Sequence, residues 1–528
     1  MLRLGSLALL LCSTLLAAPT AHAAADPQRT DPRHTAHRAA RAEAALDKVT
    51  SLLDDGLDST LGTDSGELTL ALRDLALLRS ALPPAQQREA STYLSRPTAN
   101  PNRCPDASCY TTKSVRRMCS KTVCVHYVTK ADDAVNGVPR RNRDGDHRPD
   151  YVEKVLATMT RVHQRYVDAG YRRPMSDGTR GGDGRSDIYL AQIGNQGLYG
   201  YCTTDASSLP RHGATWAYCV LDNDYSHREF PRHTSTQNMQ VTAAHEYFHA
   251  VQFGYDIGAD AWFMEATATW AEDEVFDAVN DNTGYLPYGP MGKPGLPLDT
   301  FRGGYWYGAW IFFRHLTEHF PQAQAGLPIL VRTMWRNADA ATATAPALYA
   351  TAAIEAALAD KGTDLRTQLL RMAADNLHPR RWYDEGRLYP ATRLNGSTTL
   401  SPTQPRKALG FAEDHLTSAS YRFEPSHTGP RWHLSLSLDL APVERGSAAL
   451  VRVLLETGGV RTTVVELTDA GDYTGSFDFG AGAVKAVEVT VVNGSARYNC
   501  EVGTKWTCNG RPLDQDQHQS VVAEAQRV

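Results

Sequence analysis

The feature that most restricts how this 528-residue chain can fold is a His-Glu-Tyr-Phe-His run at positions 245–249, followed downstream by Glu265. The residues around the run are apolar at helical spacing, so its two histidines project from one face of a helix. Residues 264–276 have a second apolar pattern of helical period, with Glu265 at its start. The sequence therefore predicts two helices joined by a turn over 254–262, with three polar side chains meeting between them.

These three side chains have the chemistry of a zinc site. Imidazole nitrogens and a carboxylate oxygen bind Zn²⁺ at roughly 2.0 to 2.2 Å, and three protein ligands leave a fourth position for water. We predict that His245, His249 and Glu265 are the ligands. Bound Zn²⁺ lowers the pKa of its water to about 7. Glu246 is then placed to take the proton of that water as a general base.

The alternative is that His245 and His249 are ordinary polar residues on a half-exposed helix face. The chain has 18 His and 59 acidic residues, so by chance on the order of 3 in 100 such chains contain His-Glu-x-x-His, and the bare motif is only suggestive. The helical context and Glu265 favour zinc. Further groups should orient the ligating imidazoles, and Thr269 and Glu272 on the second helix are both candidates.

The third histidine of the metzincin pattern is absent, because Gln252 and Tyr255 stand at the positions that this pattern assigns to Gly and His. With glutamate as the third ligand, the chain resembles the gluzincin class of zinc metallopeptidases. The segments His-Glu-Tyr-Phe-His-Ala-Val-Gln-Phe-Gly-Tyr-Asp and Trp-Phe-Met-Glu-Ala, the second at 262–266, resemble more closely a poorly characterised family of secreted bacterial metalloproteases. This resemblance covers about residues 100–400. It implies an α+β catalytic domain with a mixed sheet and active-site helices, and hydrolysis of peptide bonds.

The resemblance also implies a Tyr or His near the zinc that stabilises the oxyanion of the tetrahedral intermediate. By analogy we expect a Tyr that heads a later helix and has a Gly three residues on. The run Gly-Gly-Tyr-Trp-Tyr-Gly-Ala-Trp at 303–310 contains this layout, with Tyr305 as the first candidate and Tyr307 as the second. The alternative is that this aromatic run packs in the core.

A second constellation precedes the zinc motif. Oxygen-bearing side chains occupy positions 1, 3, 5, 9 and 12 of a twelve-residue loop: Asn142, Asp144, Asp146, Asp150 and Glu153. An EF-type loop binds Ca²⁺ from these positions, so the sequence predicts a calcium site followed by a helix from Tyr151 towards His163. Position 6 departs from the pattern, because it is His147 where such loops have Gly. The alternative is a solvated acidic turn at the start of that helix.

The chain divides into four predicted segments. Residues 1–23 have one early Arg, an apolar run and an Ala-His-Ala cleavage site, which are typical of a secretory signal peptide. Residues 24–100 predict a small helical region, for which a propeptide and a plain helical extension both stay open. Residues 101–404 form the predicted catalytic domain. Residues 405–528 alternate apolar and polar positions between Gly-rich turns, which predicts a β-sandwich accessory domain.

Cysteine spacing predicts disulfides. Of the nine cysteines, Cys12 lies in the signal peptide, and the others are spaced in pairs: Cys104 with Cys109, Cys119 with Cys124, Cys202 with Cys219, and Cys500 with Cys508. An even number of cysteines in an exported chain favours disulfides, and we expect each cysteine to bond to its nearest neighbour. A second metal site is the alternative, but no Cys-x-x-Cys spacing supports it.

Charge and hydropathy restrict the partners. The net charge is −5 and the Lys and Arg residues are scattered, which indicates neither a nucleic-acid partner nor a membrane surface. No run after the signal peptide reaches 18 apolar residues. We therefore expect a soluble, secreted, extracellular monomer that hydrolyses peptide or protein substrates. The alternative function is an extracellular binding or scaffold protein with a structural or vestigial zinc site.

Overall fold

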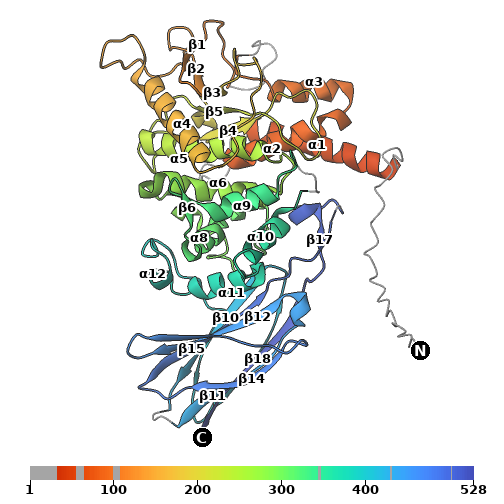
Figure 1. The fold of residues 1–528 in the computed structure, drawn as a ribbon, viewed down its shortest axis with the longest axis vertical. Coiled ribbons are helices and arrows are strands. Elements are labelled where there is room, and N and C mark those ends of the chain that lie inside the picture. Colours follow the sequence, from red (N-terminus) through yellow and green to blue (C-terminus); the bar gives the residue numbers. More distant parts are fainter. Residues whose placement is uncertain are drawn as a thin grey trace, which may run out of the picture.

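The computed structural model describes residues 32–54, 65–98, 108–342, 347–427, 431–500 and 502–527. The predicted signal peptide lies outside these residues. In Figure 1 the upper part of the molecule consists of helices around one sheet, and the lower part consists of two further sheets. The protein is a mixed α+β chain, as the sequence predicts.

The upper part is built on a five-stranded sheet with the strand order β1-β2-β3-β5-β4. Its strands are β1 (Arg116–Cys119), β2 (Val123–Tyr127), β3 (Ser186–Ala191), β4 (Gly200–Thr203) and β5 (Tyr218–Asp222). Strands β2, β3 and β5 run parallel, while β1 and β4 are antiparallel edge strands. Every residue of β2, β4 and β5 is buried, because helices cover both faces of the sheet.

One face of the sheet packs against the helices that hold the zinc motif. These helices are α4 (Asp150–Asp168), α5 (Ser235–Phe253) and α6 (Ala261–Phe276), and their apolar residues share a core with Ile188 and Leu190 of β3. Helix α5 begins with a capping box between Thr234 and Gln237. It ends at Phe253, directly before the turn predicted over 254–262. Both predicted motif helices are therefore present.

The other face of the sheet is covered by the N-terminal helices α1 (Pro32–Asp54), α2 (Ser65–Leu78) and α3 (Pro84–Tyr93). Leu72 and Leu75 of α2 share an apolar core with Tyr189 and Tyr218 of the sheet. Helix α2 also contacts the edge strand β4. The region predicted to be helical therefore packs directly on the sheet next to the motif helices.

Further helices lie between the upper and lower parts. They are α7 (Tyr305–Gly308), α8 (Trp310–His319), α9 (Ile329–Asn337), α10 (Ala350–Ala359), α11 (Leu365–Asp375) and α12 (Pro379–Trp382). A two-stranded ribbon, β6 (Ala323–Gln324) and β7 (Leu327–Pro328), precedes α9. Helix α11 contacts strands β10, β12 and β15 of the lower part.

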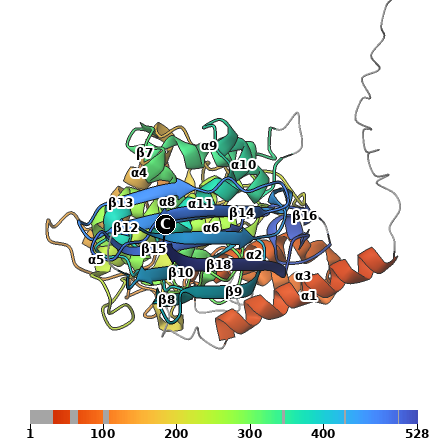
Figure 2. The same ribbon diagram turned by 90° about the horizontal axis from the view of Figure 1, so that it is seen from below.

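The lower part contains a five-stranded sheet, β13-β12-β15-β10-β8, and a four-stranded sheet, β14-β11-β18-β9. The strands are β8 (Gly396–Leu400), β9 (Arg406–Glu413), β10 (Thr417–Pro425), β11 (Trp432–Asp439), β12 (Ser447–Leu455), β13 (Val460–Val464), β14 (Asp472–Asp478), β15 (Val484–Asn493) and β18 (Gln517–Arg527). Leu436 of one sheet and Val489 of the other belong to a shared apolar core. Seen from below, both sheets lie under the upper helices, with α1 extending to one side (Figure 2). The strands predicted for this region are present, although β8 begins before residue 405. Burial alternates along β11, whereas β15 is buried almost throughout.

Three predicted disulfides are confirmed: Cys119–Cys124, Cys202–Cys219 and Cys500–Cys508. The last lies beside the short ribbon β16 (Tyr498–Asn499) and β17 (Arg511–Pro512). Cys109 is also disulfide-bonded, but its predicted partner, Cys104, lies outside the described residues. Within the described ranges, no helix combines the length and the apolar character that a membrane span requires.

Candidate metal centre

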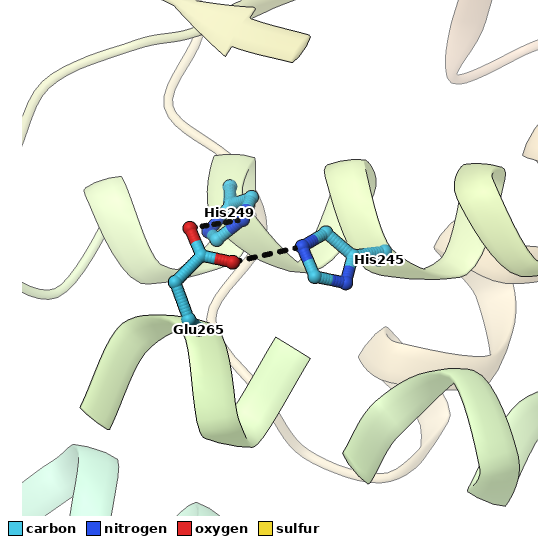
Figure 3. A group of neighbouring side chains, drawn as sticks. All are labelled: His245, His249 and Glu265. Carbon is cyan, nitrogen blue, oxygen red and sulfur yellow. Dashed lines mark hydrogen bonds and ion pairs between the residues drawn. The ribbon is translucent and has the colours of Figure 1, made fainter. Parts of the chain in front are cut away.

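Helices α5 and α6 bring the three predicted zinc ligands, His245, His249 and Glu265, together (Figure 3). Glu265 Oε2 is 3.2 Å from His245 Nε2, and Glu265 Oε1 is 3.4 Å from His249 Nε2. Ligand atoms about 2.1 Å from a tetrahedral metal ion lie about 3.4 Å from one another. The imidazole nitrogens and carboxylate oxygens therefore face one small volume at the spacing of a tetrahedral site.

The second ring nitrogen of each histidine is hydrogen-bonded to an oxygen. His245 Nδ1 donates to Glu272 Oε1 at 2.5 Å, and His249 Nδ1 donates to Gln252 Oε1 at 2.7 Å. The Gln252 amide is held in this orientation because its Nε2 donates to the backbone oxygen of Met264 at 2.8 Å. With the proton on Nδ1, a neutral ring directs the lone pair of Nε2 towards Glu265.

Two of the facing atoms, His249 Nε2 and Glu265 Oε1, have no hydrogen-bond partner among the described residues. Both side chains are fully buried. A buried polar atom without a partner costs about 1–3 kcal/mol, so two such atoms side by side require an explanation. A divalent cation satisfies both atoms at once, and imidazole nitrogen with carboxylate oxygen is a donor set that Zn²⁺ accepts. The residues present therefore fit zinc.

Burial and charge set the protonation of these groups. Burial lowers the pKa of His249 to about 4, so this ring is neutral at pH 7. Burial also acts to lower the pKa of His245, but the carboxylates of Glu265 and Glu272 outweigh it and raise this pKa well above its usual value. A cation bound at His245 Nε2 balances the negative charge of these carboxylates, as a proton on that nitrogen does. Metal binding is therefore coupled to loss of that proton.

The predicted general base, Glu246, lines the same cavity as His245 and is 1% exposed. Burial raises the pKa of its carboxyl group to about 8. The hydroxyl of Thr69, on α2, donates to Glu246 Oε2 at 3.1 Å. The same hydroxyl accepts a hydrogen bond from the backbone N–H of Cys202 at 3.0 Å. A hydroxyl of the N-terminal region thus bridges Glu246 and the edge strand β4.

The Cys202 N–H points out of the free edge of the sheet. Cys202 and Cys219 stand directly opposite each other in the antiparallel β4–β5 pair, with their Cα atoms 4.0 Å apart. Such a short separation is typical of a pair whose backbone N–H and C=O groups point away from each other's strand. Because β4 is the last strand of the sheet, this backbone donor is available to whatever lies along the edge. In this structure the Thr69 hydroxyl accepts the hydrogen bond from this donor.

The cavity beside the ligands has a volume of about 30 Å³, which is room for one or two water molecules. Tyr307 belongs to its lining, and its ring centre lies 6.1 Å from that of His245. The Tyr307 hydroxyl is buried and forms no hydrogen bond among the described residues. The first candidate for the oxyanion group, Tyr305, is not part of the lining and donates its hydroxyl to the backbone oxygen of Leu296 at 2.8 Å.

The structure therefore places the second tyrosine candidate at the site and not the first. The reason lies in the short helix α7, which begins at Tyr305. Residues two positions apart on a helix point to nearly opposite sides, so Tyr305 and Tyr307 cannot both face the cavity. The packing of α7 against α6, which the sequence does not reveal, decides which of them does.

Of the two candidates for orienting His245, the structure selects Glu272, since the hydroxyl of Thr269 has no hydrogen-bond partner among the described residues. We expect Glu272→Gln to weaken zinc binding roughly 10- to 100-fold, because the neutral amide no longer strengthens the imidazole as a donor. Competition with a chromogenic chelator measures the affinity. Thr269→Val, a substitution of similar shape at an equally buried position of α6, is the control and should leave the affinity unchanged. Equal losses in both variants would assign the effect to packing.

The five predicted calcium ligands lie in the loop before α4 and in its first turn. Asp144, Asp150 and Glu153 each bring one ligand atom to within 4.8 Å of the others. Asn142 and Asp146 accept hydrogen bonds from backbone N–H groups of the same loop. The structure therefore gathers three of the five side chains into one group.

The backbone at position 6 of this loop has the conformation that the calcium motif requires. His147 has a φ of 66°, in the left-handed region that Gly ordinarily supplies there. The departure from the sequence pattern thus leaves the loop geometry intact. A solvated acidic turn has the same hydrogen bonds, so both interpretations stay open and calcium binding stays a prediction.

Sequence reasoning missed two residues of the site. Gln252 lies three residues after His249 on the same helix face, and this spacing was a signal for a group that orients the imidazole. Thr69 had no comparable signal, because it lies 177 positions before Glu246 and reaches it only through the packing of α2 on β4.

No family model matches the chain, and a comparison with curated proteins also finds no match. Two solved structures of periplasmic inhibitors of g-type lysozyme, from Salmonella Typhimurium and Aeromonas hydrophila, align with 25% of this chain and with 99% and 98% of their own, at 13% and 12% identity and TM-scores of 0.14 and 0.15. A family GH115 4-O-methyl-α-glucuronidase aligns over 68% of this chain and 54% of its own, at 9% identity and a TM-score of 0.14. Values this low carry no argument about fold or function.

Proposed function

We propose that the protein is a secreted zinc-dependent peptidase in which Glu246 is the general base. The observation that carries this proposal is the meeting of His245, His249 and Glu265, where two buried atoms lack any partner among the described residues. Structural zinc sites usually have four protein ligands, whereas three converge here, as at catalytic sites. This difference favours an enzyme over the alternative, a binding or scaffold protein with a structural zinc ion.

Zinc held by these ligands supplies a Lewis acid, which polarises a carbonyl group and lowers the pKa of a water molecule. Glu246 accepts a proton on its carboxylate and delivers it to the leaving amine. Glu272 and Gln252 keep the ligating imidazoles in the required orientation. Tyr307 lines the cavity, and its hydroxyl, which has no hydrogen-bond partner among the described residues, donates to the oxyanion that forms on the attacked carbonyl.

Two features favour peptides over other carbonyl compounds as substrates. The first is the resemblance of the motif segments to gluzincin metallopeptidases. The second is β4, whose free edge offers the Cys202 N–H next to Glu246. An extended peptide binds to such an edge as an additional strand, which brings its own carbonyl groups alongside the carboxylate.

In the chain that has lost its N-terminal region, removal of zinc is expected to abolish hydrolysis of a denatured protein substrate, and added zinc should restore it. The reason is that three converging donors without a cation cannot activate water at neutral pH. A fluorescent peptide assay before and after chelation measures the effect, and circular dichroism checks that the fold is retained. A zinc-loaded chain that has lost its N-terminal region and still cleaves no peptide would favour the binding-protein alternative.

We also propose that residues 24–100 act as an inhibitory propeptide, the first of the two interpretations of this region. The support is the position of Thr69, whose hydroxyl is hydrogen-bonded both to Glu246 and to the backbone N–H of Cys202, the two groups that a substrate would use. The cavity that Glu246 lines has room for one or two water molecules and not for a peptide. Release of the N-terminal helices is then a condition for activity.

The end of this region is firmly held. Arg96, which follows α3 and is 6% exposed, pairs with Asp177 and Asp187 at 2.5 Å and with Asp205 at 2.9 Å. Three carboxylates around one guanidinium hold the region to the catalytic domain. Activation therefore requires both a cut in the chain and dissociation of the cut segment.

We also propose that the lower sheets form an accessory domain and that the protein is secreted. The two sheets share one apolar core, which suits a β-sandwich accessory domain. Disulfides with both cysteines among the described residues suit an oxidising environment, and so support secretion.

A further inference from the structure

A second pair of histidines one helical turn apart lies away from the candidate centre. His315 and His319 are on α8, and they face Asp375, the last residue of α11. His315 Nδ1 is 3.4 Å from Asp375 Oδ2, and His319 Nε2 is 3.7 Å from the same oxygen. These separations are close to the distance of about 3.4 Å expected between two ligands of a tetrahedral ion.

The outward-facing nitrogens of both rings are hydrogen-bond donors. His319 Nδ1 is 2.9 Å from the backbone oxygen of His315, and a carbonyl oxygen can only accept. His315 Nε2 donates to Gln368 Oε1 at 3.3 Å. The amide orientation is fixed because Gln368 Nε2 donates to Thr363 Oγ1 at 2.8 Å. A ring that is neutral therefore turns a lone pair, and not a second N–H group, towards Asp375.

Such a group of acceptors is unfavourable unless a cation lies among them. His315 is fully buried, and its Nδ1 has no hydrogen-bond partner among the described residues. Asp375 is 2% exposed and pairs with Arg452 through its other oxygen, so Oδ2 stays available.

We propose that His315, His319 and Asp375 bind a second Zn²⁺ ion. Two imidazole nitrogens and one carboxylate oxygen form the same donor set as the first centre, and each imidazole is oriented through its other nitrogen, as metal-binding histidines are. The side chain of His319 is 32% exposed, which gives the ion a route from solvent and leaves a coordination position for water.

This ion joins elements that are distant in the sequence. It connects α8 to α11, and Arg452 on β12 connects Asp375 to the lower sheets. Arg452 also donates to the backbone oxygen of Ala374 at 2.6 Å. We therefore assign the second ion the role of fastening the helical part to the C-terminal sheets, because it binds the folded chain and not the unfolded one. With three protein ligands, this site has one fewer than structural zinc sites usually have, and water takes the fourth position. This assignment does not depend on peptidase activity.

The test is the number of zinc ions bound by the full-length chain. The protein is stripped with a chelator and dialysed against zinc, and the metal is counted by mass spectrometry. We expect two ions per chain in the wild type and one in His319→Ala, which changes an exposed residue at the end of α8. His245→Ala should also bind one ion, because it removes only the first site. His518→Ala, at an exposed position on β18, is the control and should keep two.

The counts separate the two sites. A His319→Ala chain that binds as many zinc ions as the wild type overturns the proposal, and leaves His315 and Asp375 as a hydrogen-bonded pair. One ion in the wild type and none in His319→Ala supports the second site and counts against the first. If His319→Ala does not fold, wild-type crystals grown with zinc decide by anomalous scattering at the zinc edge. A peak between His315 and Asp375 supports the site, and its absence overturns it.

Discussion

Glu246→Gln is expected to lower kcat for peptide hydrolysis by about 10²- to 10⁴-fold, the range that a positioned general base contributes. The amide has nearly the same shape as the carboxylate but cannot take up a proton. The zinc ligands are untouched, and Thr69 can still donate to the amide oxygen, so zinc content and stability should stay close to wild type. Hydrolysis of a quenched fluorescent substrate, after the N-terminal region has been released, measures the change.

Glu274→Gln is the matched control for this prediction. Glu274 lies on α6, and burial raises its pKa to about 8, as it does for Glu246. Its carboxylate is 3.4 Å from Arg314 and does not line the cavity. The same chemical change there should leave activity unaltered. Equal activities of the two variants would exclude Glu246 as the base.

Release of the N-terminal helices is expected to have the second large effect, an increase in activity from near background. A recognition site for an unrelated protease, inserted between Pro97 and Cys104, allows the full chain to be cut after folding and leaves the predicted Cys104–Cys109 disulfide within the catalytic part. Gel filtration in dilute solution then separates the segment from the catalytic part. The expected reason for the increase is that Glu246 and the Cys202 N–H lose the Thr69 hydroxyl and become accessible to substrate.

The isolated segment, added back, should inhibit the cut enzyme. A Thr69→Val segment should bind the zinc-loaded enzyme about 10- to 150-fold more weakly, since the nearby cation favours the ionised form of Glu246 and a hydrogen bond to a charged group is worth about 1.5–3 kcal/mol. Ser91→Ala, at an exposed position on α3, should inhibit as well as the natural segment. Activity that stays at background after the segment has left would identify residues 24–100 as a plain helical extension.

The zinc ligands could be placed from the sequence because their relation is local. His245 and His249 are one turn apart on a single helix, and Glu265 lies near the start of the next helix, four residues after Ala261. Which of Thr269 and Glu272 orients His245 could not be predicted, because it depends on how α6 is rotated about its axis when it packs against α5. The strands of the lower sheets could also be predicted from the sequence. Successive residues of a strand point to opposite sides, and one side faces the shared apolar core.

Contacts between distant segments were beyond the sequence. The position of Tyr305 away from the cavity follows from how α7 packs, and Thr69 meets Glu246 only because α2 lies along β4. Strand β8 was missed for a similar reason. It is short and polar, so its sequence does not predict a strand, and it belongs to the sheet because it pairs in parallel with β10.

The attachment of α2 to the same chain as Glu246 has a consequence for where activity would begin. A short covalent tether holds a segment near its binding surface at an effective concentration on the order of millimolar, so even a modest intrinsic affinity keeps the site closed. One cut turns this intramolecular contact into a bimolecular complex, whose survival depends on how much protein surrounds it. A cut molecule would therefore remain inhibited where the protein is concentrated and become active as it diffuses away and is diluted.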